Sequence, residues 1–202
     1  MQFREGKSFL APPRLFRADK ALYFPNFHGQ TLQKDGVPRD TTPLLAGRAS
    51  VVAVYSSRWA EDQADSFVSP AANPALARVL GAHAGADGAG PAQLVRVNVE
   101  DNALKAGLVR LFMGGLRRRT PEADWDKYFL VRRGITEVMR EHIGLFNSKV
   151  GYVYLVDAQW RIRWAGSGPS DEGERESLAR GLERLVGEIT EPTALQQPAT
   201  AE

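Results

Sequence analysis

The chain has 202 residues, of which 43% are hydrophobic and 25% are charged, and its formal net charge at pH 7 is only +2. This length and balance suit one globular domain, and so small a net charge is no argument for nucleic-acid binding. No window approaches the ~18 consecutive apolar residues that a membrane-spanning helix needs. The sequence contains no cysteine, which excludes disulfides, zinc–thiolate sites and every reaction that uses a thiolate nucleophile.

The first twenty residues predict an extended arm with a basic character. Pro12 and Pro13 disfavour regular structure in this segment, and its basic residues outnumber the acids Glu5 and Asp19. The basic residues are Arg4, Lys7, Arg14, Arg17 and Lys20. We interpret the segment as a short basic arm or as what remains behind a cleaved transit peptide.

The first strands are expected soon after the arm. Residues 23–32 (YFPNFHGQTL) mix aromatic residues with Pro25 and Gly29, which indicates a short edge strand and a turn. Residues 35–43 predict a loop. Residues 50–55 (SVVAVY) form a continuous run rich in β-branched residues, which is typical of a central parallel strand covered on both faces.

A helix, a loop and a second central strand are expected next. Residues 59–67 predict a helix that carries on one side Trp59, Ala60, Ala64 and Phe67. Residues 81–92 (GAHAGADGAGPA) are rich in Gly and Ala, which favours a mobile surface loop. Residues 94–99 then predict a second buried strand.

The following region predicts two helices with a short strand between them. Asp101 or Asn102 is expected to cap a helix, along which apolar residues fall at helical spacing: Leu104, Leu108, Leu111 and Phe112. Residues 128–131 predict a short strand or extended segment, and residues 135–143 predict a third, short helix.

The C-terminal part predicts a hairpin and a closing helix. Residues 152–156 and 161–165 alternate around a tight turn, as the strands of a β-hairpin do. Ser170 and Asp171 open the last helix, and Asp171 and Glu174 are spaced as a capping box. The expected buried face of this helix consists of Leu178, Leu182, Leu185, Val186 and Ile189.

A βαβ unit followed by a β-hairpin and a closing helix is the layout of a thioredoxin-like α/β domain. We assign this domain to residues 21–189. The basic arm, residues 1–20, precedes it, and a flexible polar tail, residues 190–202, follows it.

The predicted domain lacks the redox features of thioredoxins. In that superfamily the first central strand runs into a Trp-Cys-x-x-Cys turn; here Trp59 takes the tryptophan position, and Ala60 and Gln63 take the two cysteine positions. A cis-proline normally precedes the hairpin strand, but Val150 and Gly151 stand there. A cis bond without proline costs roughly 2.5–4 kcal/mol, so we expect a trans bond. We therefore predict a redox-inactive domain without catalytic residues or a cofactor.

Other chemistry has little support. Ser56 and Ser57 lie near the place where some thioredoxin-like transferases keep a hydroxyl that activates glutathione, which leaves a non-thiol transferase as an alternative. Serine also commonly ends a strand or caps the next helix. His28, His83 and His142 are far apart in the sequence and have no Cys, Asp or Glu at metal-ligand spacing, so we expect no metal site.

Residues 103–133 carry most of the positive excess, with eight Lys or Arg against three acids. The basic candidates are Arg117, Arg118, Arg119, Arg132 and Arg133, interleaved with Trp125, Tyr128 and Phe129. They form a solvated surface, a surface for an anionic membrane or a partner, or an RNA-binding surface. Because no RNA-binding motif is present, we favour the membrane or partner surface and expect no nucleic acid. We also expect that replacing Arg117, Arg118 and Arg119 leaves stability nearly unchanged.

Six segments together resemble a known family. They are YFPNFHGQTL (23–32), DTTPLL (40–45), SVVAVYSSRWAEDQ (50–63), NVEDNALKAGLVRLF (98–112), KYFLVRRG (127–134) and IGLFNSKVGYVYLVDAQWRIRWAGSG (143–168). The long segment 143–168 is specific. On these residues the chain resembles the ATP10 family of mitochondrial ATP synthase assembly factors, especially its fungal members, over most of residues 23–186.

The resemblance implies a protein at the matrix side of the mitochondrial inner membrane. It would be a chaperone that binds newly made ATP synthase subunit a (subunit 6) and promotes its assembly with the ring of c subunits. The family brings no catalytic residues. An RNA-associated mitochondrial factor stays open as an alternative, as does the non-thiol transferase.

A partner-binding surface follows from the thioredoxin-like layout. In such folds the turn after the central strand faces the loop that normally carries the cis-proline, and substrate backbone commonly docks there as an added strand. We therefore expect the client at Ser56, Ser57, Trp59, Asn147, Lys149 and Val150. The alternative for Trp59 is that it packs its helix onto the sheet.

Overall fold

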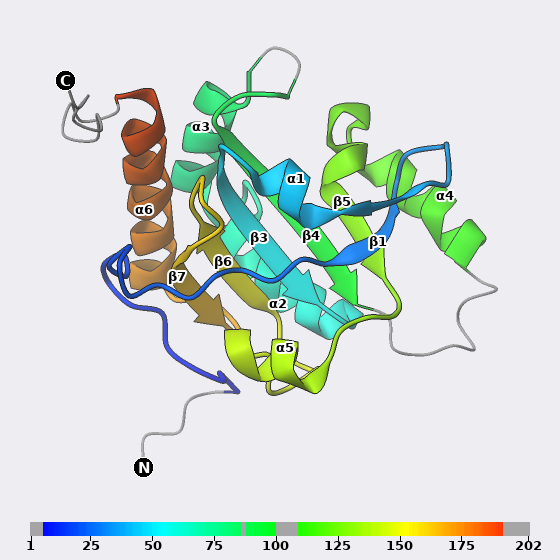
Figure 1. The fold of residues 1–202 in the computed structure, drawn as a ribbon, viewed down its shortest axis with the longest axis horizontal. Coiled ribbons are helices and arrows are strands. Elements are labelled where there is room, and N and C mark those ends of the chain that lie inside the picture. Colours follow the sequence, from blue (N-terminus) through cyan, green and yellow to red (C-terminus); the bar gives the residue numbers. More distant parts are fainter. Residues whose placement is uncertain (1–5, 86–87, 100–108, 192–202) are drawn as a thin grey trace, which may run out of the picture.

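A seven-stranded sheet with the strand order β2-β1-β5-β4-β3-β6-β7 forms the centre of the protein (Figure 1). The computed structural model describes residues 6–85, 88–99 and 109–191. Its strands are β1 (His28–Thr31), β2 (Pro38–Asp40), β3 (Ala49–Tyr55), β4 (Ala92–Val99), β5 (Tyr128–Val131), β6 (Tyr152–Val156) and β7 (Ile162–Ser167). The helices are α1 (Thr41–Leu45), α2 (Arg58–Val68), α3 (Pro74–His83), α4 (Val109–Arg119), the 3-10 helix η2 (Glu122–Lys127), α5 (Glu137–Ile143) and α6 (Glu172–Thr190).

The central strands pair as a thioredoxin-like fold requires. Strand β3 runs parallel to β4, and β4 runs parallel to β5. Strand β6 pairs antiparallel with β3 and continues into the hairpin with β7. The predicted βαβ unit, β-hairpin and closing helix are confirmed.

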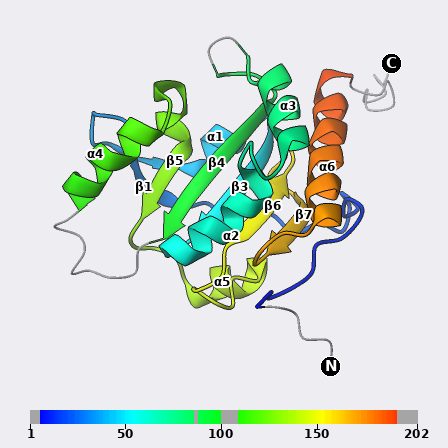
Figure 2. The ribbon, with the colours of Figure 1, turned by 180° about the vertical axis from the view of Figure 1, so that it is seen from behind.

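Strand β3 separates two apolar cores, and all seven of its residues are buried. Val51, Ala53 and Tyr55 face the core under α2, α3 and α6, which lie on one side of the sheet (Figure 2). Val52 and Val54 face the opposite core, to which α1 and α5 contribute. A strand covered on both faces is expected to be apolar throughout, as this segment is.

Helix α2 begins where the sequence predicts it, but its faces differ from the prediction. Ser57 caps the helix by accepting a hydrogen bond from the Ala60 amide at 3.2 Å. Ala60, Ala64 and Phe67 are buried, whereas Trp59 is 68% exposed. Trp59 therefore does not pack α2 onto the sheet, because it lies outside the buried face that Ala60, Ala64 and Phe67 share.

Two expected loops contain regular structure. Residues 35–43 include β2 and most of α1, and β1 lies between β2 and β5 rather than at the edge. The polar strand β2 has no apolar alternation and is held by its pairing with β1. Helix α3, which the sequence analysis did not predict, begins with the cap Asn73 and with Pro74, a strong helix start, and reaches into the Gly/Ala-rich segment as far as His83.

The last helix begins as predicted, and one predicted cap cannot be compared. Asp171 and Glu174 form a capping box at the start of α6. The proposed caps Asp101 and Asn102 lie outside the described residues, within which α4 begins at Val109. No helix in the described part of the chain combines the length and apolarity needed to span a bilayer.

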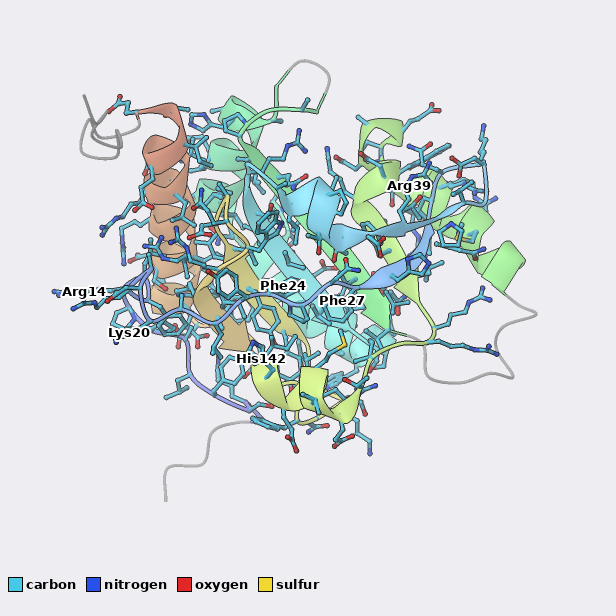
Figure 3. The ribbon with its side chains drawn as sticks, viewed as in Figure 1. Arg14, Lys20, Phe24, Phe27, Arg39 and His142 are labelled. Carbon is cyan, nitrogen blue, oxygen red and sulfur yellow. The ribbon has the colours of Figure 1, made fainter. Side chains whose placement is uncertain are left out.

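The N-terminal arm is bound to the domain along its outer strand, β7. The Trp164 indole donates to the Pro12 carbonyl at 2.9 Å, and the Phe16 amide donates to the Arg163 carbonyl at 2.7 Å. The chain then crosses the sheet, where Phe24 and Phe27 lie over its face (Figure 3). The arm thus covers an edge strand that would otherwise present unpaired backbone groups.

Candidate functional site

The two stretches predicted to meet lie together at the end of β3. The Ser56 hydroxyl donates a hydrogen bond to the Ser148 carbonyl. A shallow hollow opens beside this contact and is lined, among others, by Asn147, Val150 and Tyr152. This is the place where a thioredoxin holds its reactive turn next to the cis-proline loop.

The two cysteine positions of a thioredoxin are filled by residues that hold the structure together. Ala60 is fully buried and Gln63 is 9% exposed. The Gln63 side-chain oxygen accepts a hydrogen bond from the Gly151 amide at 2.9 Å. A side chain at Gly151 would overlap the Ala60 carbonyl oxygen, so only glycine allows this close approach. No cis peptide bond occurs among the described residues.

The loop before β6 is a rigid platform because its polar groups are satisfied within the protein. The Tyr152 phenol donates to the Asn147 carbonyl at 3.2 Å and accepts from the Asn147 amide at 3.0 Å. The Lys149 amide donates to the Asn147 side chain at 2.9 Å, and the Val150 amide donates to the Asn147 carbonyl at 3.1 Å. The amides of residues 149–151 are therefore all engaged, so an added strand could pair with them only by displacing these hydrogen bonds.

Two large aromatic side chains border this platform. Trp59 follows Ser56 by three residues and is 68% exposed, and Phe146 precedes Ser148 by two residues and is 71% exposed. Ser57, Asn147 and Lys149 are exposed around them. Val150 is buried and supports the loop from below, which corrects its expected role as a contact residue.

Phe146 is a candidate that the sequence analysis missed. It lies next to the specific 147–150 stretch, but an aromatic residue after a short helix is more often part of a core. The Gln63–Gly151 hydrogen bond was missed for a similar reason, since it joins residues 88 positions apart.

The serines show no sign of an activated nucleophile. The Ser56 hydroxyl donates to a backbone carbonyl and the Ser57 hydroxyl caps α2. Within the described part of the chain neither is hydrogen-bonded to a histidine or a carboxylate, the usual activating partners of a nucleophilic hydroxyl.

The three histidines lie apart. His28 contacts Asp40 at 2.9 Å, His142 contacts the Tyr23 carbonyl at 3.2 Å, and His83 ends α3. Among residues 6–85, 88–99 and 109–191 no three potential metal ligands gather at one place.

The predicted basic patch divides into one structural arginine and four exposed ones. Arg117 is half-buried and donates to the Leu32 carbonyl at 2.7 Å and to the Gln33 carbonyl at 3.1 Å. The premise that Arg117 is an exposed side chain is therefore wrong, and we now expect its replacement to lower stability, because two carbonyls would lose their donor. The exposed members are Arg118, Arg119, Arg132 and Arg133.

The aromatic residues between these arginines are not available for stacking. Trp125, Tyr128 and Phe129 are all buried. RNA binding by stacking requires exposed ring faces, so the structure gives this surface no aromatic platform.

Fold and site together define a thioredoxin-like domain in which an alanine and a glutamine replace the reactive thiols. The fold is similar to that of the secreted thiol-disulfide isomerase from Corynebacterium glutamicum, with a TM-score of 0.51 and 13% identity over 92% of this chain and 97% of that chain. Identity this low establishes the fold alone.

The chain belongs to the ATP10 protein family, whose family model matches residues 1–185. It is 35% identical over 183 residues to the mitochondrial ATPase complex subunit ATP10 of Eremothecium gossypii, covering 89% of this chain and 64% of that relative. It is 30% identical over 189 residues to the protein of the same name from Saccharomyces cerevisiae, covering 91% of this chain and 67% of that relative. The chain thus spans about two thirds of these relatives' length, and the family predicted from the sequence is confirmed.

Proposed function

We propose that this protein is an assembly factor of the mitochondrial F-type ATP synthase that works by binding and not by catalysis. Membership of the ATP10 family supports the first part, since relatives are named mitochondrial ATPase complex subunits. The site supports the second part. Its one decisive feature is that Ala60 and Gln63 fill the reactive positions while Trp59 stays exposed beside them.

The client is newly made subunit a (subunit 6), which the protein holds as a chaperone until the subunit joins the c-ring. A nascent membrane subunit presents apolar side chains, and Trp59 and Phe146 offer two aromatic contacts for them. Tryptophan is favoured as an interface anchor because it buries a large area with few rotatable bonds. The polar residues Ser57, Asn147 and Lys149 form a rim around the aromatics, as in many interfaces.

Recognition depends on side chains because the loop backbone is already hydrogen-bonded. The amides of residues 149–151 are engaged and so offer no free donors to an added strand. The hydrogen-bonded loop instead fixes the backbone next to Phe146, and α2 fixes the backbone of Trp59, which lowers the entropy lost on binding.

The protein acts peripherally at the matrix side of the mitochondrial inner membrane. This location follows the function of the client, which is made inside the organelle and inserted into that membrane. It is a proposal drawn from the family, and its test is fractionation of mitochondria with carbonate extraction.

Site-specific photocrosslinking during mitochondrial translation tests client binding. A photoreactive residue at Ser57 or Lys149 is expected to crosslink radiolabelled subunit a, and one at Arg118, on α4, serves as the comparison. Crosslinks from position 118 with none from positions 57 and 149 would remove the aromatic site from the proposal. A crosslinked RNA in place of subunit a would remove the chaperone function.

Neither alternative has an observation in its favour. A serine-based transferase needs an activated hydroxyl, and Ser56 is committed to the Ser148 carbonyl. An RNA-associated factor needs stacking surfaces, and the aromatic residues of the basic segment are buried.

A further inference from the structure

The N-terminal arm carries an unusual mixture of exposed apolar and basic side chains. Of the eight large hydrophobic residues that are exposed in the described part of the chain, four lie in residues 10–23: Leu10, Phe16, Leu22 and Tyr23. Arg14, Arg17 and Lys20 lie between them and are exposed as well. Alternation of this kind on one segment is typical of a surface that enters the headgroup region of a bilayer.

The arm forms one wall of a hollow whose other wall is α6. Arg14, Phe16 and Arg17 line the hollow from the arm, and Arg180 and Arg184 line it from the helix. Figure 3 shows Arg14 and Lys20 pointing outward beside α6. Cations from two elements distant in the sequence therefore converge on one side of the molecule.

Arg163 forms the base of the hollow and fixes its shape. This buried side chain pairs with Asp157 at 3.2 Å and with Glu188 at 3.3 Å. It also donates to the Phe16 carbonyl at 2.9 Å, while the Phe16 amide donates to the Arg163 carbonyl at 2.7 Å. The arm is therefore held in place before any ligand arrives.

The cations at the rim are available to an anion. Arg14 and Lys20 make no ion pair within the described residues. Arg17, Arg180 and Arg184 pair with Asp19, Glu176 and Glu188, but each arginine is at least 62% exposed. Such exposed pairs contribute little free energy, so an arginine can exchange its carboxylate for a phosphate group, which it binds in a bidentate manner.

We infer that this arm–α6 surface binds an anionic phospholipid membrane. Lipid phosphates would contact Arg14, Arg17, Arg180 and Arg184, and the apolar side chains of the arm would enter the interface between headgroups and acyl chains. A soluble phosphate would use the arginines but would leave Phe16 and the other exposed apolar residues without a role. The inference rests on the peripheral location proposed above and assigns a surface to it.

Vesicle sedimentation with the purified chain tests the inference. The protein is mixed with phosphatidylcholine vesicles that contain or lack an anionic phospholipid. The main variant is Arg14→Glu with Lys20→Glu, which changes two exposed side chains without an ion pair among the described residues. The matched comparison is Arg118→Glu with Arg119→Glu, which makes the same change of charge on the competing surface that the sequence favoured for the membrane. The aromatic residues of that surface are buried, so it lacks the exposed apolar side chains of the arm.

We expect binding to anionic vesicles to fall roughly tenfold or more in the arm variant, since each basic residue at a membrane surface contributes on the order of 1 kcal/mol. The comparison variant should change by less than about threefold. An equal loss of vesicle binding in both variants would show nonspecific electrostatic attraction and overturn the inference. So would unaltered binding by the arm variant.

Three further measurements separate lipid binding from binding of a soluble anion and from binding of the client. Phe16→Ser should weaken the binding that persists at high salt, because that part depends on apolar contact. Glycerol phosphate and sodium chloride are then compared at equal ionic strength for their ability to displace the protein from anionic vesicles. If glycerol phosphate is far more effective, the surface binds a soluble anion and the lipid assignment is overturned. Crosslinking to subunit a is measured in the same arm variant, so client binding and lipid binding can fail separately.

Discussion

Gln63 and Gly151 are joined by a buried hydrogen bond of 2.9 Å from the glycine amide to the glutamine side-chain oxygen. Gln63 takes the position of the second cysteine of a thioredoxin. Gly151 lies in the loop that carries the cis-proline in thioredoxins. The contact that would connect a reactive thiol with its substrate loop is here a structural contact between α2 and the start of β6.

Removing the acceptor should destabilise the protein without unfolding it. Gln63→Leu keeps a similar volume but leaves the buried Gly151 amide without its partner. An unsatisfied buried donor costs about 1–3 kcal/mol, so the free energy of unfolding in urea should fall by about that amount. A decrease below about 0.5 kcal/mol would show that water or another group replaces the glutamine oxygen.

Gly151→Ala should be more damaging than its size suggests. The added methyl group would overlap the Ala60 carbonyl oxygen and lie 2.9 Å from the Ala64 amide, so α2 and the loop must separate. Overpacking of this kind costs about 1–3 kcal/mol. The control is Gly187→Ala in α6, where nothing lies within 4 Å and where alanine should stabilise the helix by about 0.5–1 kcal/mol. Opposite signs in the two thermal denaturation curves are the expected result.

Arg117 should differ from its neighbours in the basic patch. Arg117→Ser removes the donor of two carbonyl hydrogen bonds and a contact over the Trp125 ring at 5.7 Å, and should cost about 1–3 kcal/mol. Arg118→Ser with Arg119→Ser changes exposed side chains and should stay within about 0.5 kcal/mol. Chemical denaturation of both variants measures the difference in the free energy of unfolding. Equal stability would contradict a structural role of the Arg117 hydrogen bonds.

Restoring two cysteines should restore a thioredoxin-like pair. Ala60→Cys with Gln63→Cys places two thiols one helical turn apart at the start of α2, which is within the roughly 7 Å between Cα atoms that a disulfide allows. Thiol alkylation followed by mass spectrometry should detect an intramolecular disulfide after mild oxidation, with the single Ala60→Cys variant as the control. Two free thiols under these conditions would contradict the alignment of this turn with that of thioredoxins.

The sequence by itself determined the structural elements that depend only on residues close together in the chain. The apolar run of β3 requires cover on both faces wherever it is placed, and the Asp171–Glu174 capping box satisfies backbone amides within one helical turn. The absence of cysteine excludes thiol chemistry in any fold. The alignment of Ala60 and Gln63 with the reactive positions also needed only the order of strand, turn and helix.

Only the tertiary structure decided which side chains remain available to a partner. Trp59 is exposed because it lies outside the buried face of α2, whereas Arg117 is engaged because two carbonyls directly after β1 accept its hydrogen bonds. The polar strand β2 exists because β1 pairs with it. The arm is ordered because Pro12 and Phe16 meet β7, about 150 residues later in the chain. Each of these results depends on contacts between distant segments, and a local pattern of residues does not specify which distant groups will satisfy a carbonyl, a guanidinium or an aromatic ring.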